Sequence, residues 1–184
     1  MTLINATFQV LAVVGTDHHP FDRLVDMVDS WCGQLMDSGE PVRCHIQYGT
    51  STPPRHVTGS DYLDKGQIAR YISAADMVIT HGGPSTILEV LHSGKRPLVM
   101  PRDPKHGEHV DEHQMRFARH MAAKDLVTLV DGPTDLNAAL ERLLAEGSDP
   151  SAAVQAMPDA ADSARRLGVL VDQLLHAQAP VRRR

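Results

Sequence analysis

The sequence of 184 residues lacks the features of a nucleic-acid or membrane protein. Aromatic residues make up 4%, and 18 Lys and Arg stand against 23 Asp and Glu. The net charge of −5 provides no excess of basic residues to bind a phosphate backbone, so we expect no nucleic-acid partner. The apolar run near the N-terminus, residues 10–14, is far shorter than the roughly 20 residues of a membrane span, and no basic signal-peptide segment precedes it. These absences favour a globular protein of the cytoplasm.

Several catalytic and cofactor motifs are missing as well. The only cysteines, Cys32 and Cys44, do not form a C-x-x-C pair, and we expect buried thiols in a reducing compartment. Neither the G-x-G-x-x-G dinucleotide fingerprint nor a Walker loop with its lysine is present. A G-x-S-x-G nucleophile elbow is absent too. These gaps disfavour P-loop chemistry and a serine hydrolase.

Short apolar runs alternate with helical patterns along the chain. The expected strands cover residues 8–14, 42–48, 77–80, 97–100 and 127–130, with a short extended piece at 56–58. The expected helices cover residues 21–36, 61–73, 85–93, 109–121 and 136–144. This alternation predicts an α/β fold, a Rossmann-like parallel sheet with helices on both faces. Because such folds bind ligands at the carboxyl ends of their strands, the loops after the strands are the candidate sites.

The first candidate loop is Thr80-His81-Gly82-Gly83-Pro84-Ser85-Thr86, between a strand and a helix. Glycine allows a close approach of the backbone to a ligand. Pro84 suits the first helical turn, and the free N–H groups of a helix start favour an anion such as phosphate. The hydroxyls of Ser85 and Thr86 add donors. The alternative is an ordinary tight turn with a serine cap.

Glu89 lies four residues after Ser85, about one helical turn further on. A carboxylate there can reach the hydroxyl pair of a ribose when the helix start holds phosphate. The alternative is a solvated helix residue.

The second candidate segment is Gly107-Glu108-His109-Val110-Asp111-Glu112-His113-Gln114. His109 to His113 reads H-x-x-E-H, the inverted zinc-protease motif, if both histidines share one helix face. A polar helix start is a second possibility. We favour a third, recognition of sugar hydroxyls, because Glu, His and Gln offer both donors and acceptors.

The third candidate loop is Gly15-Thr16-Asp17-His18-His19-Pro20, after the first strand. Its backbone can contact phosphate. A histidine here can also act as a general base, and His18 is the candidate within this chain. The alternative is a loop histidine with a structural hydrogen bond.

Several motifs in one order resemble a known family. They lie at residues 14–16, 20–25, 47–49, 75–85, 94–102 and 107–114. Together they resemble the C-terminal domain of glycosyltransferase family 28, over about residues 8–131. The similarity includes the small catalytic subunits of split enzymes, such as the PssE-type subunits of exopolysaccharide synthesis, and the C-terminal half of MurG.

The resemblance implies a donor-binding role. The family fold is GT-B, two Rossmann-like domains across a cleft, and this chain corresponds to the C-terminal half that binds a UDP-sugar. The resemblance implies that residues 82–86 hold the diphosphate and that Glu89 binds the ribose hydroxyls. It also implies that His113 and Gln114 contact the sugar. Arg102 and Glu108 stand in family-like positions without an assigned role. The implied nucleotide-sugar-binding set is Gly15, Thr16, His81, Gly82, Gly83, Ser85, Thr86, Glu89, Arg102, Glu108, His113 and Gln114.

The resemblance also implies a partner. A two-domain enzyme of this type needs about twice this length. We therefore expect a membrane-associated acceptor-binding subunit, a lipid-linked acceptor, and a location at the cytoplasmic membrane face through that partner. Residues 1–150 are the expected nucleotide-sugar-binding domain. Residues 151–184 are expected to form a helix with a basic tail, which either docks a partner or packs back on the domain.

The expected reaction is inverting sugar transfer, with the general base from the partner. The resemblance implies no cofactor and no metal, in line with the lack of a D-x-D pair near the donor loops. The alternative function is a regulatory or scaffold subunit that binds nucleotide-sugar without catalysis of its own.

Overall fold

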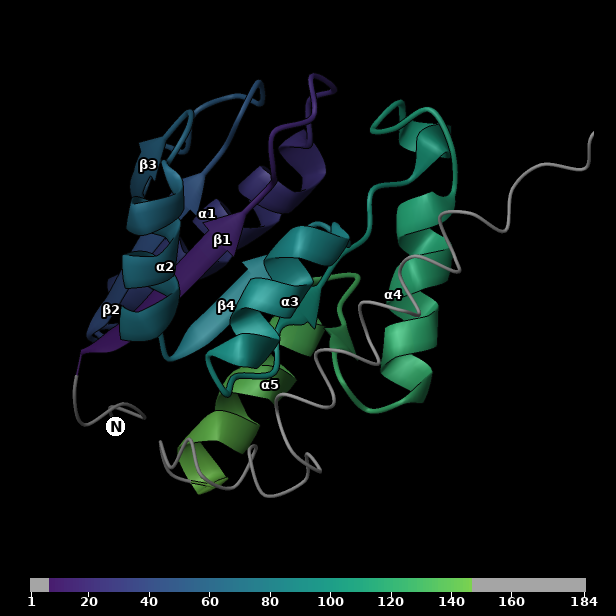
Figure 1. The fold of residues 1–184 in the computed structure, drawn as a ribbon. Coiled ribbons are helices and arrows are strands. Elements are labelled where there is room, and N and C mark those ends of the chain that lie inside the picture. Colours follow the sequence, from purple (N-terminus) through teal and green to yellow (C-terminus); the bar gives the residue numbers. More distant parts are fainter. Residues whose placement is uncertain (1–6, 147–184) are drawn as a thin grey trace, which may run out of the picture.

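The computed structural model describes residues 7–146, which form one six-stranded sheet with helices on both faces (Figure 1). The strands are β1 (Phe8–Val13), β2 (Val42–Gln47), β3 (Thr58–Ser60), β4 (Met77–Thr80), β5 (Leu98–Val99) and β6 (Thr128–Leu129). Every neighbouring pair is parallel, in the order β3-β2-β1-β4-β5-β6. The predicted α/β fold class is confirmed.

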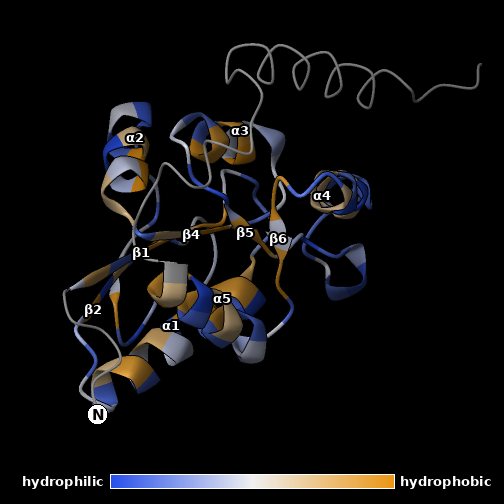
Figure 2. Ribbon diagram, turned by 90° about the horizontal axis from the view of Figure 1, so that it is seen from below, coloured by the Kyte–Doolittle hydropathy of each residue, from blue (hydrophilic) through white to orange (hydrophobic). Residues whose placement is uncertain are grey.

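The helices form two layers around the sheet (Figure 2). They are α1 (Asp22–Asp37), α2 (Lys65–Ala74), α3 (Pro84–His92), η1 (Pro104–His106), α4 (His113–Ala123) and α5 (Pro133–Glu146). Val10 and Ala12 of β1 pack with α1 and α5, whereas Leu11 and Val13 belong to the core beneath α2 and α3. Both faces of β1 are therefore buried, which explains its continuous apolar sequence.

The strand order fixes where a ligand can bind. From β1 the chain winds outward through β2 and β3, and from β4 it winds the other way through β5 and β6. The carboxyl ends of β1 and β4 therefore meet at a switch point, where open α/β sheets bind their ligands. The loops that follow these two strands are residues 14–21 and 81–83.

Two elements on the β3 side begin later than expected. The extended piece is Thr58–Ser60, and α2 begins at Lys65 instead of residue 61. Asp64 accepts from the Gln67 N–H, and the Gln67 side chain accepts from the Asp64 N–H, each at 2.8 Å. This capping box fixes the helix start.

The helix expected from residue 109 begins at His113, so the H-x-x-E-H interpretation is wrong. His109 lies in the loop before α4 and does not share a helix face with His113. The His113 N–H donates to the Asp111 carboxylate at 2.9 Å, which turns the chain into the helix at that point. The two histidines therefore lack the helical spacing that a zinc protease requires.

The cysteines, the membrane-span expectation and the C-terminal residues remain to be compared with the structure. Cys32 and Cys44 are free and buried, as predicted. Within residues 7–146 no helix is long and apolar enough to cross a bilayer. The helix and basic tail predicted for residues 151–184 lie outside the described residues.

Candidate functional site

The imidazole of His81 is wedged between two glycines at the switch point. His81 is 8% exposed, and its Nδ1 lies 3.2 Å from the Val13 carbonyl oxygen. A Cβ on Gly15 would lie 2.5 Å from the ring, and one on Gly83 2.3 Å from Nε2. Burial lowers the pKa of His81 to about 4, so the ring is neutral at physiological pH. Since a carbonyl only accepts, Nδ1 carries the proton that points to Val13.

Gly15→Ala is expected to lower the free energy of unfolding by about 2 kcal/mol. Gly15 has a φ of +82°, which L-residues rarely adopt, and the added methyl would overlap the buried His81 ring. Urea denaturation of the full chain measures the change. Gly39→Ala is the matched control, because Gly39 has a similar φ of +85° but open space around it. Equal losses in the two variants would show that backbone strain alone, and not the contact with His81, requires glycine at position 15.

The start of α3 faces the same switch point. Gly83 is its N-cap, and Pro84 occupies the first turn as predicted, one residue before the expected helix start at residue 85. Glycine has no side chain to cap the helix, so the first-turn N–H groups depend on other partners, and such groups attract anions. Ser85 is exposed and Thr86 is half-buried at this end, and Glu89 is half-buried one turn later.

Arg102 is fully buried and holds three loop carbonyls. Its guanidinium donates to the Val14 oxygen at 2.8 Å, to the His19 oxygen at 2.7 Å and to the Glu108 oxygen at 3.0 Å. It also lies over the Phe21 ring, 4.8 Å from the centroid. Arg102 therefore ties the loop after β1 to the segment before α4.

Glu108 has a similar structural position. It is 4% exposed, and its carboxylate accepts from Arg23 at 2.9 and 2.8 Å and from the Asp103 N–H at 2.8 Å. The Glu108 hydrogen bond raises the pKa of Arg23. Predicted as a binding residue together with Arg102, Glu108 is occupied here by contacts within the chain. Through these contacts both residues position the loops around the switch point.

The first turn of α4 closes the site from the other side. Next to it, a Cβ on Gly82 would lie 3.1 Å from the Gln114 Cβ, so these two predicted residues are neighbours. The Oε1 atom of Gln114 is buried and has no hydrogen-bond partner among the described residues. His113 contacts Asp111, with 2.5 Å between Nδ1 and Oδ1. Gln114 thus has a buried acceptor without a partner beside Gly82.

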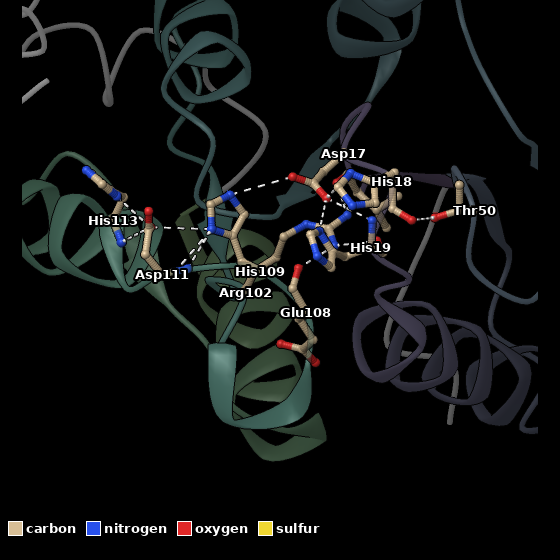
Figure 3. Close-up of polar contacts among 10 residues, drawn as sticks. Asp17, His18, His19, Thr50, Arg102, Glu108, His109, Asp111 and His113 are labelled. Carbon is tan, nitrogen blue, oxygen red and sulfur yellow. Dashed lines mark hydrogen bonds and ion pairs between the residues drawn. The ribbon is translucent and has the colours of Figure 1, made fainter.

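Alternating histidines and aspartates connect the two loops (Figure 3). His19 Nδ1 lies 2.6 Å from Asp17 Oδ1, and His109 Nε2 lies 3.6 Å from Asp17 Oδ2. On its other side, His109 Nδ1 is 3.4 Å from Asp111 Oδ1. Although burial favours the protonated carboxyl, hydrogen bonds from His19 lower the pKa of Asp17 below its ordinary value.

Sequence reasoning singled out His18, His109 and His113, but not His19 or the two aspartates of this cluster. Asp17 and Asp111 are the centres that the imidazoles surround. The available signal was that Asp17 directly precedes His18, and that Asp111 lies two residues from both His109 and His113. The contact between Asp17 and His109 could not be predicted, because it joins two segments that are distant in sequence. His18, the candidate base, is 84% exposed, and Thr16 is exposed as well.

An all-parallel sheet of this order, with a glycine-proline helix start that has no side-chain cap at its switch point, is typical of nucleotide-binding α/β domains. Residues 10–167 match the model of the glycosyltransferase family 28 C-terminal domain, so the chain belongs to that family. It is 30% identical over 149 residues to a Yarrowia lipolytica protein, "UDP-N-acetylglucosamine transferase subunit ALG13". That alignment covers 72% of this chain and 69% of the relative.

Solved structures agree on the fold. MurG of Acinetobacter baumannii superposes with a TM-score of 0.57 at 20% identity, over 93% of this chain and 50% of MurG. The glycosyltransferase of kitacinnamycin superposes with a TM-score of 0.56 at 21% identity, over 94% of this chain and 44% of that enzyme. The fold is that of the C-terminal half of a GT-B glycosyltransferase. The chain spans about half the length of these enzymes.

Proposed function

We propose that this chain is the donor-binding catalytic subunit of a two-component inverting glycosyltransferase. Its donor is a UDP-sugar, and its acceptor is a lipid-linked molecule held by a membrane-associated partner. The observation that carries the proposal is the start of α3 at the switch point, with Gly83, Pro84 and Ser85 at the place where such folds bind phosphate.

The remaining predicted residues are arranged around that helix start. Glu89 follows one turn into α3, at a position suited to the ribose hydroxyls. Gln114 lies beside Gly82, and its unpartnered Oε1 can accept a hydrogen bond from a sugar hydroxyl once the side chain turns this buried oxygen toward the ligand. His113 adjoins it at the first position of α4. The Gly15 and Thr16 backbone lines the β1 side.

A separate acceptor subunit is supported by what the comparisons print for one relative. The described residues correspond to one of the two domains of a GT-B fold. The Yarrowia protein is itself described as a subunit. The location that follows is the cytoplasmic membrane face, reached through the partner.

The chemistry would proceed as follows. An acceptor hydroxyl attacks the anomeric carbon, the bond from that carbon to the diphosphate oxygen breaks, and negative charge collects on the departing UDP. The N–H groups at the start of α3 are fixed before the reaction, so they stabilise that charge without reorganising. The hydroxyl proton goes to a base on the partner. His18 is the alternative base within this chain, because its ring is exposed to solvent.

Calorimetric titration of the full chain with UDP, UDP-N-acetylglucosamine, UDP-glucose and GDP tests the donor site. We expect the uridine nucleotides to bind more tightly than GDP without added metal. UDP binding without sugar transfer, even in the presence of the partner, would favour the regulatory or scaffold alternative. Absence of any nucleotide binding by the chain and by its complex would contradict the proposal.

Glu89→Ala is expected to weaken UDP binding about tenfold or more, because a charged hydrogen bond to ribose contributes roughly 1.5–3 kcal/mol. Thermal melts with and without UDP measure the loss, and the melting temperature without ligand should change little. Glu141→Ala is the matched control, since Glu141 is an exposed helical glutamate of α5 on the opposite face of the sheet. Unchanged stabilisation of the Glu89 variant by UDP would remove the ribose role.

A further inference from the structure

We propose that Asp17, His18 and His19 form a binding site for one divalent transition-metal ion, with Zn²⁺ as the reference ion. The three residues follow β1 and offer one carboxylate and two imidazoles, and their ligand atoms all lie within 4.8 Å of one another. This site does not use His109 or His113, the pair of the H-x-x-E-H interpretation. It does not depend on donor binding.

The distances within the site are close to those of a tetrahedral zinc centre. Bonds of about 2.0–2.1 Å at tetrahedral angles place neighbouring ligand atoms roughly 3.3 Å apart. Nδ1 of His19 lies 2.6 Å from Asp17 Oδ1, and Nδ1 of His18 lies 3.8 Å from the same oxygen. One contact must lengthen and the other must shorten, each by less than 1 Å. The exposed His18 ring has the freedom to make this adjustment.

Neighbouring side chains fix the backbone that carries the two histidines. The carbonyl of His19 accepts from Arg102 at 2.7 Å, and the carbonyl of His18 accepts from Thr50 at 3.0 Å. The second Asp17 oxygen faces Nε2 of His109 at 3.6 Å. An outer residue that orients a liganding carboxylate in this way strengthens metal binding. Only the short side-chain adjustments remain to be made when the ion binds.

The ligand chemistry selects the class of ion. Two imidazoles with one carboxylate suit Zn²⁺ and similar transition metals, whereas Mg²⁺ and Ca²⁺ prefer oxygen ligands. Asp17 and His19 are about a quarter exposed and His18 is 84% exposed, so an ion can enter from solvent. To bind the ion, Nδ1 of His19 must give up any proton that it shares with Asp17. Three protein ligands leave a position for water or an anionic oxygen.

Calorimetric titration of the full chain with ZnCl₂ tests the site. We expect one tight site in the wild-type chain and a loss of affinity of at least 10–100-fold in His18→Asn. Because the His18 ring is exposed, this variant should keep its fold, which circular dichroism checks. His92→Asn is the matched control, since His92 is an exposed histidine at the far end of α3. Its affinity for Zn²⁺ should equal that of the wild type.

Co²⁺ absorption spectra give a second measurement of the same site. Nitrogen and oxygen ligands in a four-coordinate arrangement should give intense visible bands in the wild type, which disappear in Asp17→Asn and in His19→Asn. Mg²⁺ should show no binding to the wild-type chain. The proposal is overturned if the wild-type chain has no stoichiometric zinc site, or if His18→Asn and His92→Asn bind zinc equally well. Neither result affects the UDP titration, so this site and the donor site can fail separately.

Discussion

Arg102→Ala is expected to lower the free energy of unfolding by about 3–5 kcal/mol. The substitution removes a fully buried guanidinium and leaves the carbonyls of Val14, His19 and Glu108 without their donor. Each buried acceptor without a partner costs roughly 1–3 kcal/mol, although water entering the cavity offsets part of this cost. The loss is a large fraction of the 5–15 kcal/mol that typically stabilises a domain.

Urea denaturation followed by circular dichroism measures the change. Arg96→Ala is the matched control, because Arg96 pairs at the surface with the exposed Asp125, and such exposed pairs contribute little to stability. Arg102→Lys should fall between the two, since one ammonium cannot reproduce the planar fork that reaches three carbonyls. A loss in Arg102→Ala as small as in Arg96→Ala would mean that the loops hold their arrangement without Arg102.

The Arg102→Ala substitution should also weaken the binding of UDP. Arg102 joins the loop after β1, which contains Gly15, to the segment that leads into α4. Gln114 lies in the first turn of that helix, beside Gly82. At temperatures where Arg102→Ala stays folded, UDP affinity should fall although Arg102 itself has no exposed surface. An unchanged UDP affinity in the folded variant would separate loop stability from donor binding.

The strands that matter most for the site could be predicted from sequence because they are buried on both faces. The apolar run that forms β1 and the four residues of β4 leave little choice of structure, and β4 matches its predicted bounds. The strand order, by contrast, depends on which strands pair across the fold. No local pattern states that β1 lies between β2 and β4. Only the family resemblance suggested where the switch point falls.

The missed boundaries and roles have particular physical causes. The start of α2 was visible in the sequence as Asp64 followed three residues later by Gln67, a capping signal that helical periodicity overrode. The start of α4 depends on Asp111, whose carboxylate accepts from the His113 N–H and contacts histidines in the same segment. The resemblance assigns no role to Arg102, and its contacts could not be predicted because the carbonyls of Val14 and His19 come from segments distant in sequence.

His81 gives the second large expected effect, a loss of stability as the pH falls from about 6.5 to about 4. Burial lowers the pKa of His81 from 6.5 to about 4 in the folded chain. Across that window the unfolded chain binds a proton that the folded chain does not, so stability rises with pH and is lost on acidification. The shift corresponds to roughly 3 kcal/mol, with a slope approaching about 1.4 kcal/mol per pH unit.

The aspartates of the site change the stability of the fold only at a lower pH. The carboxyls of Asp17 and Asp111 have pKa values lowered from 3.8, so the stability that they contribute is present above that value and is lost only below it. His45 titrates in the same direction as His81, because partial burial lowers its pKa. His45→Asn is therefore the matched control for the pH range between about 4 and 6.5.

Urea denaturation at pH 4.5, 5.5, 6.5 and 7.5 measures the slope in the wild type, His81→Asn and His45→Asn. Asparagine can still donate to the Val13 carbonyl but does not titrate, so His81→Asn should be less stable at pH 7.5 and lose most of the slope. His45→Asn should keep most of it. If His81→Asn and the wild type share one slope, the ring accepts a proton in the folded state at no cost. In that case His81 would be a positive charge at the switch point, available to the donor diphosphate.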